Sequence, residues 1–153
     1  MTVNVDNIGR TDDQILAQMR SDAKVLSLEE MLHAGALATD PNEKLAFYQT
    51  TAESFPKCVR AHNNVGATYL SLGKADEALA ALEKAKAIQN NDAVKNNEAF
   101  AYLLKGNIAK AEELFNSMTA ATSESKWGLG VIAITKGEYD KAVEQKNLAK
   151  NIV

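Results

Sequence analysis

Two pairs of neighbouring asparagines, Asn63–Asn64 and Asn96–Asn97, are the residues whose type and spacing most invite a chemical role. A side-chain amide carries both donors and an acceptor, so it can bond to a peptide group, to an adjacent helix or to water. Both pairs lie in segments with a helical pattern, although asparagine is a poor helix former. The pairs are 33 residues apart, which indicates equivalent positions in a repeated unit.

Cys58 and His62 could carry nucleophilic or metal-binding chemistry. Four residues apart on a helix, they can meet on one face as a Cys–His nucleophile or as two metal ligands. A zinc site needs three or four ligands, and His33 is the only other histidine. The glycines are isolated and form no phosphate-binding loop. We therefore expect no enzyme activity, no metal and no cofactor, with Cys58 an inert, partly buried residue in a turn between repeats.

Composition restricts the class of protein. The chain has 153 residues, enough for one domain with a substantial core. Its net charge of −3 without blocks of like charge argues against a nucleic-acid partner. The sequence has no apolar run of about 18 residues and no basic-then-apolar start, so we expect no membrane insertion and no signal peptide. We expect a soluble protein, cytoplasmic or periplasmic, and a fragment of an exported protein fits equally well.

A glycine recurs at nearly constant spacing, because Gly73, Gly106 and Gly137 are 33 and 31 residues apart. Each glycine ends one helical pattern, and a few residues later an alanine opens a second amphipathic helix. Glycine tolerates the left-handed conformation that stops a helix, and a small alanine lets two helices approach closely. One such hairpin cannot bury its apolar face alone, so stacked copies are required. The alanines are Ala78, Ala111 and Ala142.

These recurring positions resemble the tetratricopeptide repeat family, whose unit is a 34-residue helix pair. The resemblance implies an all-α, right-handed superhelix of stacked antiparallel helix pairs. The proline usually found after the second helix is replaced near Asn90 and Ser123, which departs from the family pattern. The copy beginning at Val59 carries the pattern as Val65-Gly66, Tyr69, Gly73, Ala78, Leu82 and Ala85.

The same register predicts one domain over residues 11–153, preceded by a disordered segment over residues 1–10. Ser27 and Glu30 form a capping box that opens the first, degenerate copy, and Asp40–Pro41 makes an N-cap with proline at the first helical position. An extra amphipathic helix over residues 11–21 would close the N-terminal end of the array. The four repeats are expected at about residues 27–58, 59–91, 92–122 and 123–153.

The resemblance implies that the first helices of successive repeats line a concave groove that binds a peptide or protein segment. In some family members, asparagines at the repeat position of Asn64 hold the backbone of an extended peptide. The carboxylate clamp of other members needs lysine and arginine at positions that here hold residues such as Asn63 and Ala93, so we do not expect that specificity. The candidate groove residues are Arg60, Asn63, Asn64, Ala67, Asn96, Asn97, Phe100 and Trp127.

Trp127 allows two interpretations. An aromatic residue beside polar ones is the usual profile of an interface anchor. The segment around it, "WGLGVIAIT", is apolar nearly all round, which suits burial between neighbouring helices. We favour burial of Trp127 between helices over a role in binding.

The last helix, expected over about residues 138–152, has apolar residues on one side and lysines and a glutamate on the other. It either closes the array or is covered by further repeats or a partner. The sequence thus favours a protein-interaction module, and the alternative is a scaffold that positions neighbouring domains or self-associates through this helix. The stretch "SLEEMLHAGALATDPNEKL" also resembles tetratricopeptide arrays of bacterial cell-envelope proteins, which concerns only localisation.

Overall fold

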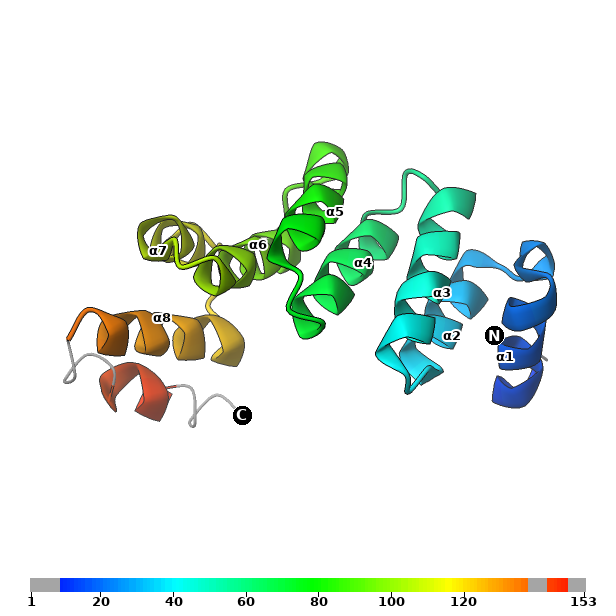
Figure 1. The fold of residues 1–153 in the computed structure, drawn as a ribbon, viewed down its shortest axis with the longest axis horizontal. Helices are drawn as coiled ribbons and strands as arrows, with labels where there is room; N and C mark the ends of the chain where they lie inside the picture. The colour runs from blue at the N-terminus through cyan, green and yellow to red at the C-terminus, as the bar shows by residue number, and fades with distance from the viewer. Residues whose placement is uncertain (1–8, 138–142, 149–153) are drawn as a thin grey trace.

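The protein is a row of packed helices. The computed structural model describes residues 9–137 and 143–148, and these residues contain no β-strand. Figure 1 shows the helices following one another in space in chain order, from α1 at one end to α8 near the other. Residues 143–148 are also helical. The helices are α1 (Asp12–Ser21), α2 (Leu28–Leu37), α3 (Pro41–Ser54), α4 (Val59–Ser71), α5 (Ala75–Ile88), α6 (Asp92–Leu104), α7 (Ile108–Asn116) and α8 (Ser123–Thr135), with a short 3₁₀ helix η1 (Ala23–Val25) after α1.

Helices α2 and α3 begin at the capping signals that the sequence contains. The Ser27 hydroxyl accepts the Glu30 N–H, and the Glu30 carboxylate accepts the Ser27 N–H at 3.0 Å, so the predicted capping box is confirmed. Asp40 caps α3, and Pro41 occupies its first turn, as predicted.

Glycine ends the first helix of each later pair. Gly73, Gly106 and Gly137 have φ of 75°, 80° and 78°, the left-handed conformation that was predicted for them. At the first of these turns the N–H of Lys74 bonds to the carbonyl of Tyr69 at 2.9 Å, which satisfies a carbonyl at the helix end.

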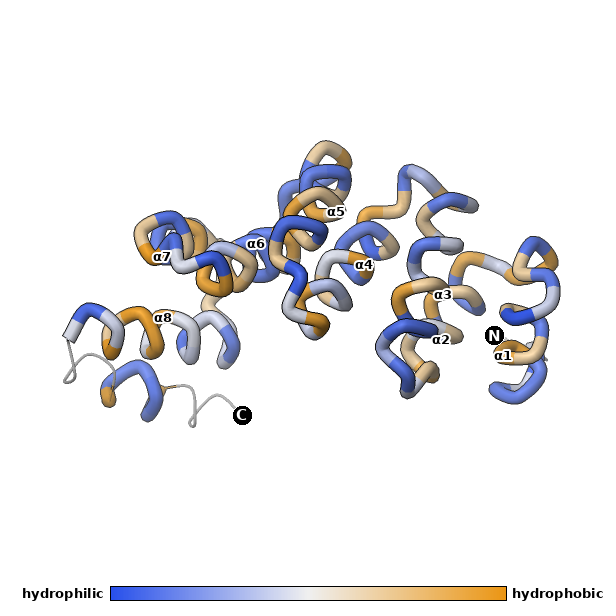
Figure 2. The backbone as a smooth tube through the Cα atoms, in the orientation of Figure 1, coloured by the Kyte–Doolittle hydropathy of each residue, from blue (hydrophilic) through white to orange (hydrophobic). Residues whose placement is uncertain are grey.

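Small residues let the helices of a pair approach closely. Ala78 and Ala111 are completely buried, as expected for the alanines that open the second helices. Gly66 lies against Leu82, so closely that an added Cβ would be 2.7 Å from the leucine side chain. The core therefore runs along the array between successive helices, and Figure 2 shows hydrophobic and hydrophilic residues alternating along most of them.

The helix expected over residues 11–21 corresponds to α1. Its Ile15 and Met19 are buried against Met31 and Phe47 of the next two helices, so α1 covers the N-terminal end of the array. Arg10, just before it, forms an ion pair with Glu30 at 3.0 Å. Residues 1–8 of the segment predicted to be disordered lie outside the described residues, as do residues 138–142 and 149–152 of the predicted last helix.

Candidate peptide-binding groove

A groove of about 510 Å³ lies on the face formed by the first helices of three successive pairs. We call it the first-helix groove. None of its lining residues is charged, and all of them come from α4, α6 and α8. They are Ala67, Leu70, Ser71, Asn97, Phe100, Leu103, Leu104, Trp127 and Val131.

Four of the eight predicted site residues, namely Ala67, Asn97, Phe100 and Trp127, line this groove. Asn96 lines a second cavity of about 280 Å³, which shares Asn97 with the first and lies between the N-terminal ends of α6 and α8. The remaining three, Arg60, Asn63 and Asn64, line neither cavity. The structure thus brings together the apolar part of the predicted site.

The asparagines of α4 and α6 are hydrogen-bonded to each other. The amide nitrogen of Asn97 donates to the side-chain oxygen of Asn63 at 3.0 Å. At a spacing of 33, Asn97 corresponds to Asn64 and not to Asn63. The bond therefore joins residues that are not equivalent in their repeats. The oxygen of Asn96 is buried and has no hydrogen-bond partner among the described residues.

Arg60 is engaged elsewhere. Its guanidinium pairs with the carboxylate of Glu29 on α2. This hydrogen bond lowers the pKa of Glu29 and raises that of Arg60. Arg60, at the polar end of the predicted groove, therefore belongs to a surface ion pair between α2 and α4.

Trp127 is exposed, so the expectation of burial is wrong. Its side chain is 58% exposed, although α8 is apolar nearly all round. The reason is the packing of α8, which turns Gly128, Ile132 and Ala133 inward and leaves the indole on the groove side.

The Trp127 ring lies beside the Phe100 ring, with centroids 6.1 Å apart. Phe100 in turn meets the buried Phe115 edge to face, with centroids 5.1 Å apart. The three rings form a continuous chain from the core to the groove surface. An exposed tryptophan supported in this way is held in place before any partner arrives.

Leu104 is a groove residue that the sequence reasoning missed. It is 51% exposed and follows Leu103, which also lines the groove. Ile134, seven residues after Trp127 and so on the same face of α8, is 53% exposed. The signal for Leu104 was its position at the end of a helix, next to the glycine turn, where apolar side chains often remain exposed.

Of Cys58 and His62, the two residues considered for catalysis, His62 is hydrogen-bonded to the backbone. His62 places its Nε2 2.8 Å from the carbonyl oxygen of Pro56. The described residues contain no group of three or more His, Cys, Asp or Glu side chains that could hold a metal ion. Within the same part of the chain, no helix is long and apolar enough to cross a membrane.

Comparisons with known proteins agree with this architecture. Residues 45–93 match the family model described as tetratricopeptide repeat. A comparison with curated proteins finds no match.

Solved structures share the fold at low sequence identity. A crystal structure of MamA is 19% identical, with a TM-score of 0.71 over 92% of this chain and 87% of that chain. TTC0263, a thermophilic TPR protein in Thermus thermophilus, is 19% identical, with a TM-score of 0.76 over 93% of this chain and 83% of that one. MamA from Desulfovibrio magneticus RS-1 is 16% identical, with a TM-score of 0.71 over 92% and 85%.

Such helical arrays serve in general as scaffolds for protein–protein interaction and not as catalysts. The family match over residues 45–93, the glycine-ended helix pairs and the shared fold together support a tetratricopeptide repeat assignment for this chain.

Proposed function

We propose that this protein binds an extended segment of a partner protein in the first-helix groove, using apolar side chains as anchors. The observation that supports this is the exposure of Leu104 and Trp127, at 51% and 58%, in a groove with no charged lining residue. Soluble proteins rarely expose contiguous large apolar side chains unless a partner covers them.

The partner's anchors would be apolar or aromatic side chains. Trp127 and Phe100 offer ring faces, and Leu103 and Leu104 offer aliphatic surface beside them. Buried aromatic anchors surrounded by neutral contacts are the usual source of binding energy in an interface. A partner segment rich in charge would gain little from this surface.

The asparagine pair supports an additional backbone contact. Asn97, which lines the groove, donates one amide hydrogen to Asn63 and keeps its second amide hydrogen and its oxygen for a donor–acceptor pair of bonds. A peptide group carries one N–H and one C=O, so the pair complements it. This role for the amides is secondary to the apolar anchors.

The test uses a peptide selected from a displayed random 12-residue library against the full chain. Binding of the labelled peptide is measured by fluorescence anisotropy. Because a central aromatic anchor typically contributes about 2 kcal/mol or more, we expect Trp127→Ala to weaken binding by roughly 30-fold. Ile134→Ala is expected to weaken it by a smaller factor.

Ile88→Ala is the matched control for Ile134→Ala. Both isoleucines are exposed, at 41% and 53%, but Ile88 lies on α5 and away from the first-helix groove. We expect Ile88→Ala to leave binding of this peptide unchanged. Full binding by Trp127→Ala would exclude the first-helix groove as the site.

The rival function is a self-associating scaffold. Val143 and Leu148, in the helical residues 143–148, are 59% and 41% exposed, which gives an apolar surface at that end of the described chain. Sedimentation velocity at several protein concentrations separates the two functions. A monomer at all concentrations excludes self-association as the function, whereas a dimer abolished by Leu148→Ser favours it.

A further inference from the structure

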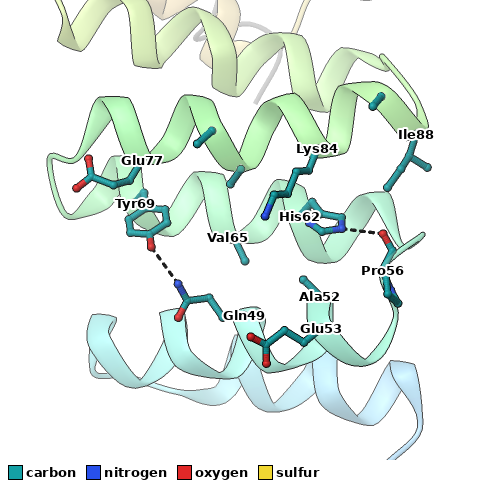
Figure 3. Close-up of a pocket in the computed structure, with 13 residues that line it drawn as sticks. Gln49, Ala52, Glu53, Pro56, His62, Val65, Tyr69, Glu77, Lys84 and Ile88 are labelled. Atoms are coloured by element: carbon teal, nitrogen blue, oxygen red, sulfur yellow. Dashed lines mark hydrogen bonds between the residues drawn. The ribbon is translucent and has the colours of Figure 1, made fainter.

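A larger groove lies on another face of the array. It has a volume of about 840 Å³ and runs between α3 and α5, with α4 as its floor (Figure 3). We call it the α3–α5 groove. It shares no residue with the first-helix groove.

The α3 wall of the α3–α5 groove is tied to the α4 floor at both ends. Gln49 on α3 donates from its amide nitrogen to the hydroxyl of Tyr69 on α4 at 2.9 Å. At the opposite end, His62 on α4 donates from Nε2 to the carbonyl of Pro56, which follows α3, at 2.8 Å. Both bonds are visible in Figure 3. Because these bonds hold α3 against α4, the groove is formed before a partner binds.

The floor between these bonds is apolar. Val65 is buried at its centre, and the walls carry small side chains, among them Ala52, Ala80 and Ala81. Small side chains let the backbone of another helix approach closely. Ile88 adds a larger apolar side chain, 41% exposed, at the end near Pro56.

The next repeat shows that this apolar floor is not a general property of the fold. Val65 corresponds, 33 residues on, to Glu98, which is only 3% exposed. The Glu98 carboxylate lies 3.5 Å from the ammonium of Lys86 on α5. A buried carboxylate paired with a partly exposed lysine therefore occupies the equivalent place between α5 and α6, whereas the α3–α5 groove has an apolar floor.

Carboxylates stand on both walls of the groove. Glu53 projects from α3 and Glu77 from α5, both exposed (Figure 3), and neither has an ion-pair partner within the described part of the chain. Lys84 is the only lysine or arginine among the lining residues. The rim thus carries two negative charges against one positive charge.

We propose that the α3–α5 groove binds a basic amphipathic helix of a partner protein. The lining residues of α5 recur at every turn from Glu77 to Ile88, a length of roughly 16 Å, which corresponds to three turns of a docked helix. The apolar face of that helix lies on Val65 and the alanines, and lysine or arginine side chains on both flanks pair with Glu53 and Glu77.

The probe is a fluorescein-labelled 14-residue peptide with leucines at helical spacing on one face and lysines on both flanks. Two companion peptides carry glutamates in place of the lysines, or two central prolines that prevent a helix. Binding to the full chain is measured by anisotropy at low and high salt. We expect only the basic helical peptide to bind, and more weakly at high salt.

Variants of the protein locate the site. Glu53→Lys combined with Glu77→Lys is expected to weaken binding at least about tenfold, because two attractive contacts become repulsive. Glu83→Lys reverses one carboxylate on α5 at a residue that does not line the groove, and should leave binding within about twofold.

A steric variant tests the cavity itself. Ala80→Trp fills the groove from an exposed position and should abolish binding, whereas Glu113→Trp places the same ring at the equivalent position on α7 and should not. Circular dichroism verifies that both variants stay folded. If Ala80→Trp binds the basic helix as the wild type does, the proposal is overturned.

Other occupants give different results, and each would also overturn the proposal. Equal binding of the proline-containing peptide would indicate an extended segment. Concentration-dependent self-association of the wild-type chain, abolished by Ala80→Trp, would indicate a second copy. Because Ile88→Ala should weaken this peptide and Ile134→Ala should not, the result is independent of the test of the first-helix groove.

Discussion

At the residue scale, Asp92 shows how one carboxylate joins two repeats. It lies in the first turn of α6 and accepts the backbone N–H groups of Thr119 at 2.8 Å and Ala120 at 2.9 Å. These two bonds hold the connection before α8 against the start of α6. They lower the pKa of Asp92, with the Thr119 bond as the larger cause and the Ala120 bond next.

The lowered pKa predicts a pH-dependent contribution to stability. A depressed carboxyl pKa stabilises the folded state fully above the unfolded pKa of about 3.9, and the contribution is lost as the pH falls through the folded value. We therefore expect Asp92→Asn to lower the melting temperature at neutral pH. The difference from wild type should shrink as the pH falls below about 4, as thermal unfolding followed by circular dichroism at stepped pH would show. A difference that stays constant down to a pH of about 2 would contradict the role given to these bonds.

At the element scale, the position of α8 depends on one glycine. A Cβ added at Gly128 would lie 2.4 Å from Cζ of Phe115 on α7. Phe115 is 4% exposed and is held in turn by the ring of Phe100, so it has little room to move. The backbone of α8 can approach α7 only because this position has no side chain. The same approach places Trp127 beside Phe100.

Replacing this glycine should destabilise the array. We expect Gly128→Ala to cost about 1–3 kcal/mol of unfolding free energy in urea denaturation, because it overpacks the contact between α7 and α8. The double variant with Phe115→Leu should be less destabilised than the sum of the two single changes, since the smaller side chain leaves room for the new methyl group. Strict additivity would show that the two residues do not meet in solution.

At the scale of the whole molecule, stability should vary along the array. Helices pack on their neighbours in the row, and α6 also contacts α4 and α8, so the core is a series of clusters along the array and not one central core (Figure 1). Helices α4 to α6 have packed neighbours on both sides. In repeat proteins, stability is close to a sum of terms for repeats and for nearest-neighbour interfaces.

Hydrogen exchange followed by mass spectrometry checks this expectation. The amides of α4 to α6 should exchange most slowly, because opening them disrupts interfaces on two sides. The amides of α1 and of residues 143–148 should exchange fastest among the helical residues. Uniform protection along the described chain would instead indicate a single cooperative unit.

Much of the architecture could be predicted because its signals are local. Gly73, Gly106 and Gly137 end helices through their own backbone freedom, and Asp40–Pro41 begins one through its own side-chain and ring chemistry. Such residues act within one turn of the chain, so their spacing reveals the repeat before any packing is known.

The candidate site was predictable only in part. The repeat rows placed Ala67, Asn97, Phe100 and Trp127 on successive first helices, and these residues do line one groove. The exposure of Trp127 and the bond between Asn97 and Asn63 depend on the angle and offset between neighbouring helices. Periodicity along one helix does not contain that information.

By itself, the sequence determined that this chain forms stacked helix pairs, where those pairs turn, and which residues lie on the first helix of each. Those features arise from backbone conformation and from the period of one helix. Only the tertiary structure decided which side chains remain exposed and which grooves open between helices. The α3–α5 groove illustrates the reason, because it exists only where a wall from α3 and a wall from α5 flank the apolar floor of α4.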